Sequence, residues 1–517
     1  MKFVKGQIFK NVGSSWFALG MNVVVGIFLS PYIIHRLGDE AFGLWILIFS
    51  VTGYYGLFDL GIRSSIVRYV AKYAATGEHE ELNSLINTAM IAYSGIGTLT
   101  LAITLISSYY VTSIFHIPAD FVVTARCLLL MVGTCVSLGF PLGVFGGILE
   151  GLQRFYLLNF TNISSTLLRA LLIVVVLRSG HGLLTVALIT VSLPLLAGLV
   201  NAAAVLRHLN LRFAPKYVTR SSLHRIATYS GTTFLIIIGA RLRFKTDALV
   251  IGTFVSAAAI TYFTIGSRLV DYASEVVSSL AQIFVPMSSQ SQAKGDLDGL
   301  RKILILGNRA CAYIIFPITA VLTILGKSVI EAWVGSKYVA TSYPVMLVLL
   351  YPTTLMLAQS ASGRTLWGMA KHGTWAWVVL AEGASNLILS IILVRPYGIL
   401  GDAIGTAIPL MCSTILFLPR HVCRLLGIKL STYLYRGFVF PLLLCIPMIA
   451  VLLLMQRWFI PHRLSQLLIQ LVIAGSVYAT GLAWAFLTRR AWDIGRLGAN
   501  REDEVTIDLA ERYQEEA

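Results

Sequence analysis

Long apolar stretches recur along the whole chain, and each ends at a short group of charged residues, glycine or proline. Most of them run for roughly 20 residues or more, the length that a helix needs to cross a bilayer. Because a backbone in lipid has to satisfy its own hydrogen bonds, each stretch should be a helix. The pattern predicts an all-α, polytopic membrane protein with about 14 spans, at residues 11–34, 42–66, 85–111, 122–148, 157–178, 183–206, 228–252, 257–284, 303–326, 341–365, 374–394, 400–424, 437–455 and 466–488.

The composition agrees with this prediction. Hydrophobic residues make up 57% of the chain and charged residues only 12%, whereas soluble domains carry about 25% charged residues. The first apolar stretch, residues 12–34, is too long for the core of a signal peptide, and no small-residue cleavage site follows it. We therefore expect it to be retained as the first span.

The positive charge sets the expected orientation. The formal net charge is +16, but Lys and Arg gather in alternate loops, as in proteins that follow the positive-inside rule. This distribution favours membrane orientation over nucleic-acid binding. It predicts a multi-pass protein of the inner (plasma) membrane with both termini and the 489–517 tail in the cytoplasm.

The chain also repeats itself at a nearly constant offset. Residues 12–15 (VGSS) resemble residues 230–233 (SGTT), and residues 77–82 resemble residues 295–300, both 218 positions on. Each predicted repeat holds an even number of spans, so the two halves should insert with the same orientation. The repeat predicts a six-helix bundle at 1–217, a second at 218–427, and two further helices at 428–488.

Motifs for metal or cofactor chemistry are lacking in the sequence. The six cysteines show no CxxC spacing, and no Walker A sequence occurs. We expect no metal site, no cofactor and no catalytic residue.

Positive charges cluster within the predicted seventh span, where lipid tolerates them poorly. Residues 238–247 read IGARLRFKTD and hold Arg241, Arg243 and Lys245 with a single acid, Asp247. A charge at the bilayer centre costs about 2.5–3.5 kcal/mol on insertion scales. Arg243 can pair with Asp247 on one helix face, but no acid in this span balances Arg241 and Lys245. We predict a cationic wall of a water-filled cavity; pairing with acids on other helices is the alternative.

The predicted eighth span holds Arg268, Asp271 and Glu275 at spacings that share one helix face. They form either a local salt-bridge network or a cavity lining in which an acid serves as a coupling site for a proton or cation. Asp59 and Arg63, near the end of the second span, are expected to pair at (i, i+4). Other polar residues in spans are expected to hold helices together: Asn162, Arg169, Arg309, Arg364, Glu382 and Asn386.

A run of motifs in the first part of the chain carries a family resemblance. It comprises Leu37-Gly38, Phe42-Gly43-Leu44-Trp45, Asp59-Leu60-Gly61 and Gly77-Glu78. The run resembles the N-terminal signature of polysaccharide-repeat (O-antigen type) flippases of the multidrug/oligosaccharidyl-lipid/polysaccharide exporter superfamily. Asp247, followed by Leu249-Val250-Ile251-Gly252, is similar to the matching segment of that family's second half.

The resemblance implies two parallel six-helix bundles around a central V-shaped cavity that helices 1, 2, 7 and 8 line. It implies alternating-access transport of an undecaprenyl-diphosphate-linked oligosaccharide for cell-surface polysaccharide biosynthesis. Expected partners are this substrate, membrane lipids, a glycan polymerase and assembly proteins, and not nucleic acid. In this scheme Arg241, Arg243, Lys245 and Arg268 bind substrate, while Asp59, Arg63, Asp247, Asp271 and Glu275 serve coupling or gating.

Other functions stay open at this point. A multidrug/cation antiporter of the same fold commonly has an acid in its first helix, and residues 12–34 contain none. A lipid II flippase of the same fold also uses cationic cavity residues. A membrane glycosyltransferase or polymerase would need a sizeable outer loop, and the outer loops predicted here are short.

Overall fold

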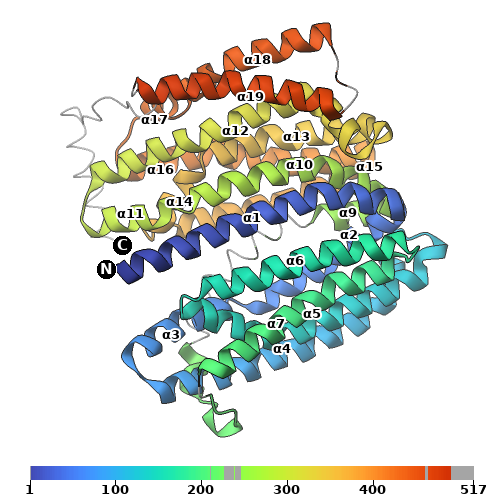
Figure 1. Ribbon diagram of the computed structural model, residues 1–517, viewed down its shortest axis with the longest axis vertical. Coiled ribbons are helices and arrows are strands. Elements are labelled where there is room, and N and C mark those ends of the chain that lie inside the picture. The colour runs from blue at the N-terminus through green and yellow to red at the C-terminus, as the bar shows by residue number, and fades with distance from the viewer. Residues whose placement is uncertain are drawn as a thin grey trace. The chain divides into compact units, whose positions relative to one another are not determined.

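The computed structural model describes residues 2–209, 211–225, 238, 241, 246–459, 461, 464–488 and 490, and among these it contains helices and no strand (Figure 1). The described residues divide into two compact units, within the bounds Met1–Thr261 plus Val394–Ile399 and Tyr262–Leu393 plus Leu400–Ala517. The all-α class expected from the apolar stretches is thereby confirmed.

The first unit is built from long helices and short connecting turns. Figure 1 shows α4, α5, α6 and α7 running side by side, and α1 packs along α6. Ile66, Ile86 and Ile148, from three of its helices, belong to one buried apolar core. Its elements are α1 (Lys2–Leu37), α2 (Asp39–Gly53), the 3-10 helix η1 (Tyr54–Asp59), α3 (Ile62–Thr76), α4 (His79–Ile114), η2 (Ala119–Phe121), α5 (Val122–Gly151), α6 (Phe155–Arg178), α7 (Leu183–His208), η3 (Pro215–Tyr217), α9 (Asp247–Phe254) and the start of α10 (Ala257–Ala281).

The second unit continues from α10 and centres on one long helix, α12, against which α11, α13, α14 and α18 pack. Its further elements are α11 (Phe284–Ala293), α12 (Leu297–Val334), η4 (Ser336–Tyr338), α13 (Val339–Ala358), α14 (Ser360–Gly368), α15 (Gly373–Cys412), the π-helix η5 (Ser413–Phe417), α16 (Leu418–Leu426), α17 (Leu430–Leu434), the π-helix η6 (Tyr435–Val439), α18 (Phe440–Trp458) and α19 (Leu464–Leu487).

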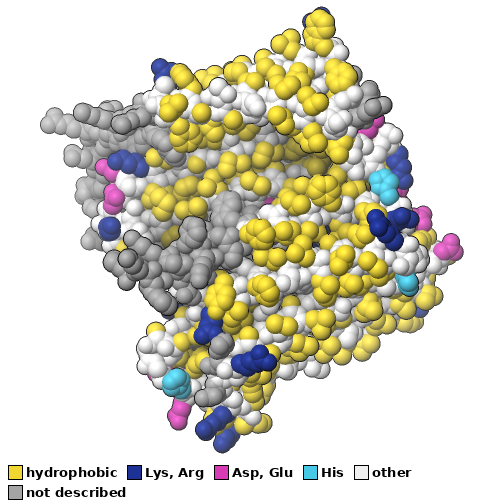
Figure 2. All heavy atoms as spheres, in the orientation of Figure 1, with side chains coloured by type: hydrophobic (Ala, Val, Ile, Leu, Met, Phe, Trp, Pro, Cys, Tyr) yellow, Lys and Arg dark blue, Asp and Glu magenta, His cyan; other side chains and the backbone are white. Residues whose placement is uncertain are grey.

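The protein is a multi-pass membrane protein. In the described residues, 11 helical segments are long and apolar enough to cross a bilayer, with mean hydropathies from 1.3 to 2.8. Large apolar side chains such as Phe28, Val123 and Phe160 are about 70% exposed, and Figure 2 shows apolar side chains spread over the visible face. Such a surface suits lipid, because soluble proteins rarely expose large contiguous apolar patches.

The helix ends show where local chemistry overrides the hydropathy pattern. Residues 42–66 were expected to form one span, but the chain breaks after Asp59, where Leu60 and Gly61 take the left-handed conformation (φ 49° and 78°). The expected seam near residue 398 is confirmed, since Gly398 has φ 58° inside α15. Of the span expected at 228–252, most lies outside the described residues, and Asp247 begins α9.

The boundary between the compact units differs from the boundary between the sequence repeats. The first unit extends to Thr261, and its α2 packs against α9 and the start of α10. A Cβ on Gly43 would lie 1.8 Å from the carbonyl oxygen of Ala257, and Thr261 donates a hydrogen bond to the carbonyl oxygen of Asp39 at 2.6 Å. The compact units are defined by packing and the repeats by sequence similarity, so one boundary does not test the other. The division of the repeats at 217/218 stays a prediction.

A buried polar network holds the C-terminal segment to α12. The hydroxyl of Tyr433 lies 3.1 Å from Asn308 Nδ2, 2.9 Å from Ser362 Oγ and 3.0 Å from Gln359 Oε1. Arg309, also on α12, donates to the carbonyl oxygen of Arg436 at 2.8 Å. These contacts hold α17 and η6, the segment directly before the last two helices, to α12 and to the start of α14.

Candidate substrate pocket

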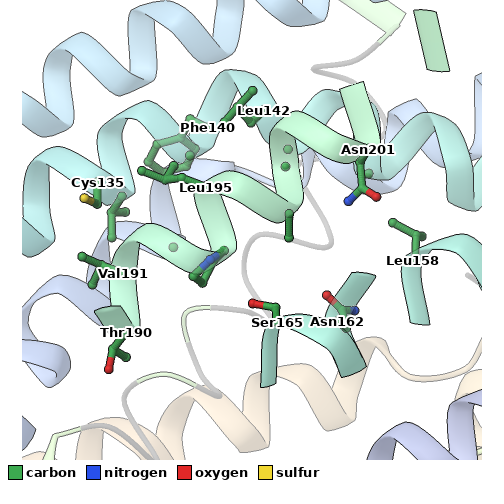
Figure 3. Close-up of a pocket in the computed structure, with 18 of the residues that line it drawn as sticks. Cys135, Phe140, Leu142, Leu158, Asn162, Ser165, Thr190, Val191, Leu195 and Asn201 are labelled. Carbon is green, nitrogen blue, oxygen red and sulfur yellow. The ribbon is translucent and has the colours of Figure 1, made fainter. Parts of the chain in front are cut away.

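The first unit contains a pocket of about 880 Å³, within the range of roughly 300–1,000 Å³ typical of small-molecule sites. Residues of α1, α2, η1, α3, α4, α5, α6 and α7 line it. Figure 3 shows Asn162 and Ser165 of α6 and Asn201 of α7 around the same open space, with Phe140 and Leu195 among its apolar walls. The pocket thus offers many hydrogen-bonding groups inside a unit whose helices are apolar outside.

A charged cluster belongs to the same lining. Arg63 donates to both carboxylate oxygens of Glu150, at 2.6 Å from Nη2 and 3.3 Å from Nε. The Asp59 carboxylate accepts a hydrogen bond from the hydroxyl of Tyr93. Because the helix breaks at Leu60, Asp59 and Arg63 do not share a continuous helix face. The expected (i, i+4) pairing of these two residues is therefore wrong, and each binds a residue of a different helix.

Small residues on α5 make room for Arg63. A Cβ on Gly146 would lie 3.4 Å from Arg63 Nη2, and one on Gly147 would lie 3.0 Å from the side chain of Ile66. A Cβ on Gly151 would lie 2.8 Å from the side chain of Val70. Without side chains at these positions, α3 can approach α5 closely enough for the Arg63–Glu150 ion pair to form.

Arg241, one of the four residues predicted to bind substrate, lies beside this pocket. A Cβ on Gly56 would stand 2.9 Å from Arg241 Nη2, and one on Gly53 would stand 4.0 Å from Nη1. Both glycines line the pocket. Arg243 and Lys245, predicted from the same segment, lie outside the described residues.

The remaining predicted residues lie on two other helices. Asp247 begins α9 in the first unit, next to Thr246, whose hydroxyl is 3.0 Å from that of Tyr54. Arg268, Asp271 and Glu275 lie on the continuous helix α10, with Arg268 half-buried and both acids exposed. They do not line the pocket of the first unit, and their roles stay predictions.

Several pocket residues escaped the sequence analysis. Asn162 and Arg169 were expected to hold helices together, yet both line the pocket; Asn201 and Glu150 were not singled out at all. By contrast, Ser413 of η5 donates to Glu382 of α15 at 2.5 Å, and Thr406 donates to Asn386 at 3.1 Å across the kink at Gly398 in α15. Both bonds join separate helical segments, as expected of these two residues. The spacing of Asn162 and Arg169 on one face of α6 was the available signal, because polar residues two turns apart in a span mark a polar face.

Known proteins resemble this chain along most of its length. Residues 8–292 match the family described as polysaccharide biosynthesis protein. The membrane protein EpsK of Bacillus subtilis (strain 168) is 23% identical over 446 residues, which cover 84% of this chain and 86% of that protein. A Shigella flexneri protein named as an O-antigen transporter is 20% identical over 418 residues, which cover 79% of this chain and 96% of that protein.

The fold also has a counterpart among solved structures. The inward closed conformation of the lipid II flippase MurJ superposes with a TM-score of 0.71 at 16% identity, covering 92% of this chain and 98% of that one. At this identity the likeness concerns the fold alone. The family itself is shown by the match over residues 8–292, which confirms the resemblance drawn from the first motifs: this chain belongs to the polysaccharide biosynthesis protein family.

Proposed function

We propose that the protein is a flippase. It moves an undecaprenyl-diphosphate-linked oligosaccharide from the cytoplasmic to the outer leaflet of the inner membrane, for cell-surface polysaccharide biosynthesis. Transport occurs by alternating access, both termini lie in the cytoplasm, and no covalent bond of the substrate changes.

The observation that carries the proposal is the polar pocket inside a membrane-spanning unit. A sugar cannot enter the hydrocarbon of a bilayer without losing its hydrogen bonds to water, and each unsatisfied polar group costs several kcal/mol. The pocket offers replacements from Asn162, Ser165 and Asn201, among others. The polyprenyl tail needs no such help, because it can stay in lipid while the headgroup crosses.

The diphosphate requires positive charge along the path. Arg241, with its guanidinium against Gly56 at the pocket, supports a role as a phosphate anchor, because guanidinium binds phosphate oxygens in pairs and stays charged when desolvated. Arg243, Lys245 and Arg268 are proposed to share this role. Asp59, Arg63, Asp247, Asp271 and Glu275 are proposed to couple transport to an ion or to gate the path.

Two other activities fit less well. A carrier of cationic drugs would favour acids in its binding site, whereas the pocket is lined by Arg63 and Arg169 as well as by Asp59 and Glu150. A glycosyltransferase or polymerase needs a catalytic surface outside the membrane. The connection between α6 and α7, on the proposed outer side, spans only residues 179–182.

Reconstitution in liposomes tests the proposal directly. Purified protein should move a fluorescent undecaprenyl-diphosphate oligosaccharide between leaflets, measured as the fraction that an added membrane-impermeant quencher can reach. Mass spectrometry of the recovered lipid should show the original mass. Lipid II serves as the comparison substrate. Movement of lipid II alone, or a recovered lipid with a transferred or polymerised glycan, would contradict the proposal.

A further inference from the structure

Three polar side chains form a stripe along one face of α6. Asn162, Ser165 and Arg169, spaced three and four residues apart, share a helix face and all line the pocket. Figure 3 shows Asn162 and Ser165 directed at the open space. We call these three residues the α6 stripe.

Within the described part of the chain, the side chains of the stripe form no hydrogen bond or ion pair with protein, unlike other polar residues on the same helix. Thr166 donates to Asn22 at 3.1 Å, and Thr161 donates to Asn201 at 3.2 Å. Helix-to-helix contacts therefore account for Thr161 and Thr166 but not for the stripe.

Charge balance in the pocket singles out Arg169. Of the other charged lining residues, Arg63 is paired with Glu150, and Asp59 is bound by Tyr93. Arg169 is half-buried within an apolar span, where an uncompensated charge is costly and marks a functional position. Its guanidinium offers up to five N–H donors to an acceptor entering the pocket.

The stripe combines three kinds of donor and acceptor. An amide and a hydroxyl both donate and accept, which matches sugar hydroxyl groups, whereas a guanidinium only donates and prefers an anion. We propose that the α6 stripe binds a saccharide that carries an oxyanion, with Arg169 on the oxyanion and Asn162 and Ser165 on neighbouring sugar hydroxyls. This inference rests on the proposed function and deepens it by naming the part of the substrate that the first unit recognises.

Two sources would present this chemistry. One is the phosphate on the first sugar, where the glycan joins its carrier; the other is the carboxylate of an acidic sugar within the glycan. Both place an oxyanion beside hydroxyl groups, so one site serves either, and soluble sugars can tell them apart. Glucose 1-phosphate represents the first source, glucuronate the second, and glucose is the neutral control.

A native cysteine reports occupancy of the pocket. Cys135 lines the same pocket (Figure 3), while Cys127 and Cys412 are exposed residues elsewhere. Full-length protein in nanodiscs is treated with a small maleimide at increasing sugar concentrations, and peptide mass spectrometry follows each cysteine. An anionic sugar should slow the labelling of Cys135 and leave the labelling of Cys127 and Cys412 unchanged. The concentration of anionic sugar that halves the labelling rate of Cys135 should be about tenfold lower than the concentration of glucose with the same effect.

Matched variants separate binding from folding. Arg169→Gln should remove the preference for the anionic sugar over glucose, and Arg169→Lys should keep part of it. Arg178→Gln, on the same helix but exposed at its end, should behave as the native protein. Ser165→Ala should weaken protection by all three sugars, whereas Ser164→Ala, which does not line the pocket, should not.

Each outcome has one meaning. Protection by glucose 1-phosphate alone assigns the oxyanion to the carrier phosphate, and protection by glucuronate alone assigns it to an acidic sugar. Equal protection by glucose, no protection by any sugar, or an Arg169→Gln variant with an unchanged preference overturns the proposal. The liposome assay is read separately: transport without sugar protection refutes the stripe alone, and sugar protection without transport refutes the proposed function alone.

Discussion

The Arg63 guanidinium and the Glu150 carboxylate form a two-pronged ion pair between α3 and α5, with its shorter contact at 2.6 Å. The two residues are 87 positions apart in the chain, and both line the pocket. Their side chains are 48% and 26% exposed, so the pair is partly solvated and open to change during transport.

Breaking this pair should affect transport more than stability. Exposed ion pairs contribute roughly 0.2–1 kcal/mol, so Arg63→Met and Glu150→Gln should each lower the melting temperature only slightly. Both variants should slow transport in liposomes, and the double variant should lose less than the sum of the two. Arg220→Met, at an exposed arginine outside the pocket, serves as control; strictly additive losses would argue against a functional pair.

Gly43 should tolerate no side chain. A Cβ there would lie 1.8 Å from the backbone oxygen of Ala257, and overpacking against backbone costs about 1–3 kcal/mol or more. Gly43→Ala should reduce thermal stability and yield in detergent, measured by fluorescence size-exclusion chromatography. Gly95→Ala, on α4 with nothing within 4 Å of the new Cβ, should be neutral or slightly stabilising; equal losses in both variants would refute the packing argument.

Tyr433 should contribute to stability through its hydroxyl. Tyr433→Phe leaves Asn308, Ser362 and Gln359 short of a buried partner, at a cost of about 1–3 kcal/mol. Thermal unfolding should reveal this loss. Tyr435→Phe, at a position 69% exposed, should leave the melting temperature unchanged, and a native-like Tyr433→Phe would show that the network stabilises little.

Arg241 should be essential for export. Arg241→Ala should reduce surface glycan at least tenfold in a complemented strain, with the protein inserted at normal abundance, because a charged hydrogen bond is worth about 1.5–3 kcal/mol. Arg241→Lys should retain part of the activity. Gly56→Ala should give an intermediate loss of export. Its new Cβ would lie only 2.9 Å from Arg241 Nη2 and would push the guanidinium out of its position. Arg207→Ala is the matched control, and normal export by Arg241→Ala would exclude a phosphate anchor there.

The orientation predicted from Lys and Arg can be tested with reporter fusions. A cytoplasmic reporter should be active when joined after Gly295, in the turn between α11 and α12, and an external reporter when joined after Ser336. Activities on the opposite sides would overturn the proposed topology and, with it, the direction of transport.

The sequence by itself determined the class of this protein and most helix positions. Whether an apolar stretch forms a membrane-spanning helix depends on the composition of that stretch and not on the helices around it, so each span can be predicted from the sequence alone. For the same reason the seam at Gly398 was predictable, since glycine tolerates its positive φ. The early motifs were enough to indicate the family.

Only the tertiary structure decided which polar faces meet. Hydropathy places Asn162 and Arg169 in a span but does not say whether that face meets a neighbour, lipid or a pocket. The left-handed turn at Leu60 redirected Arg63 to Glu150, a partner that no local spacing indicates. The pocket exists because residues of α1, α5, α6 and α7 converge on it. How these helices converge depends on the packing of whole helices against one another, and the hydropathy of a single span carries no information about that packing.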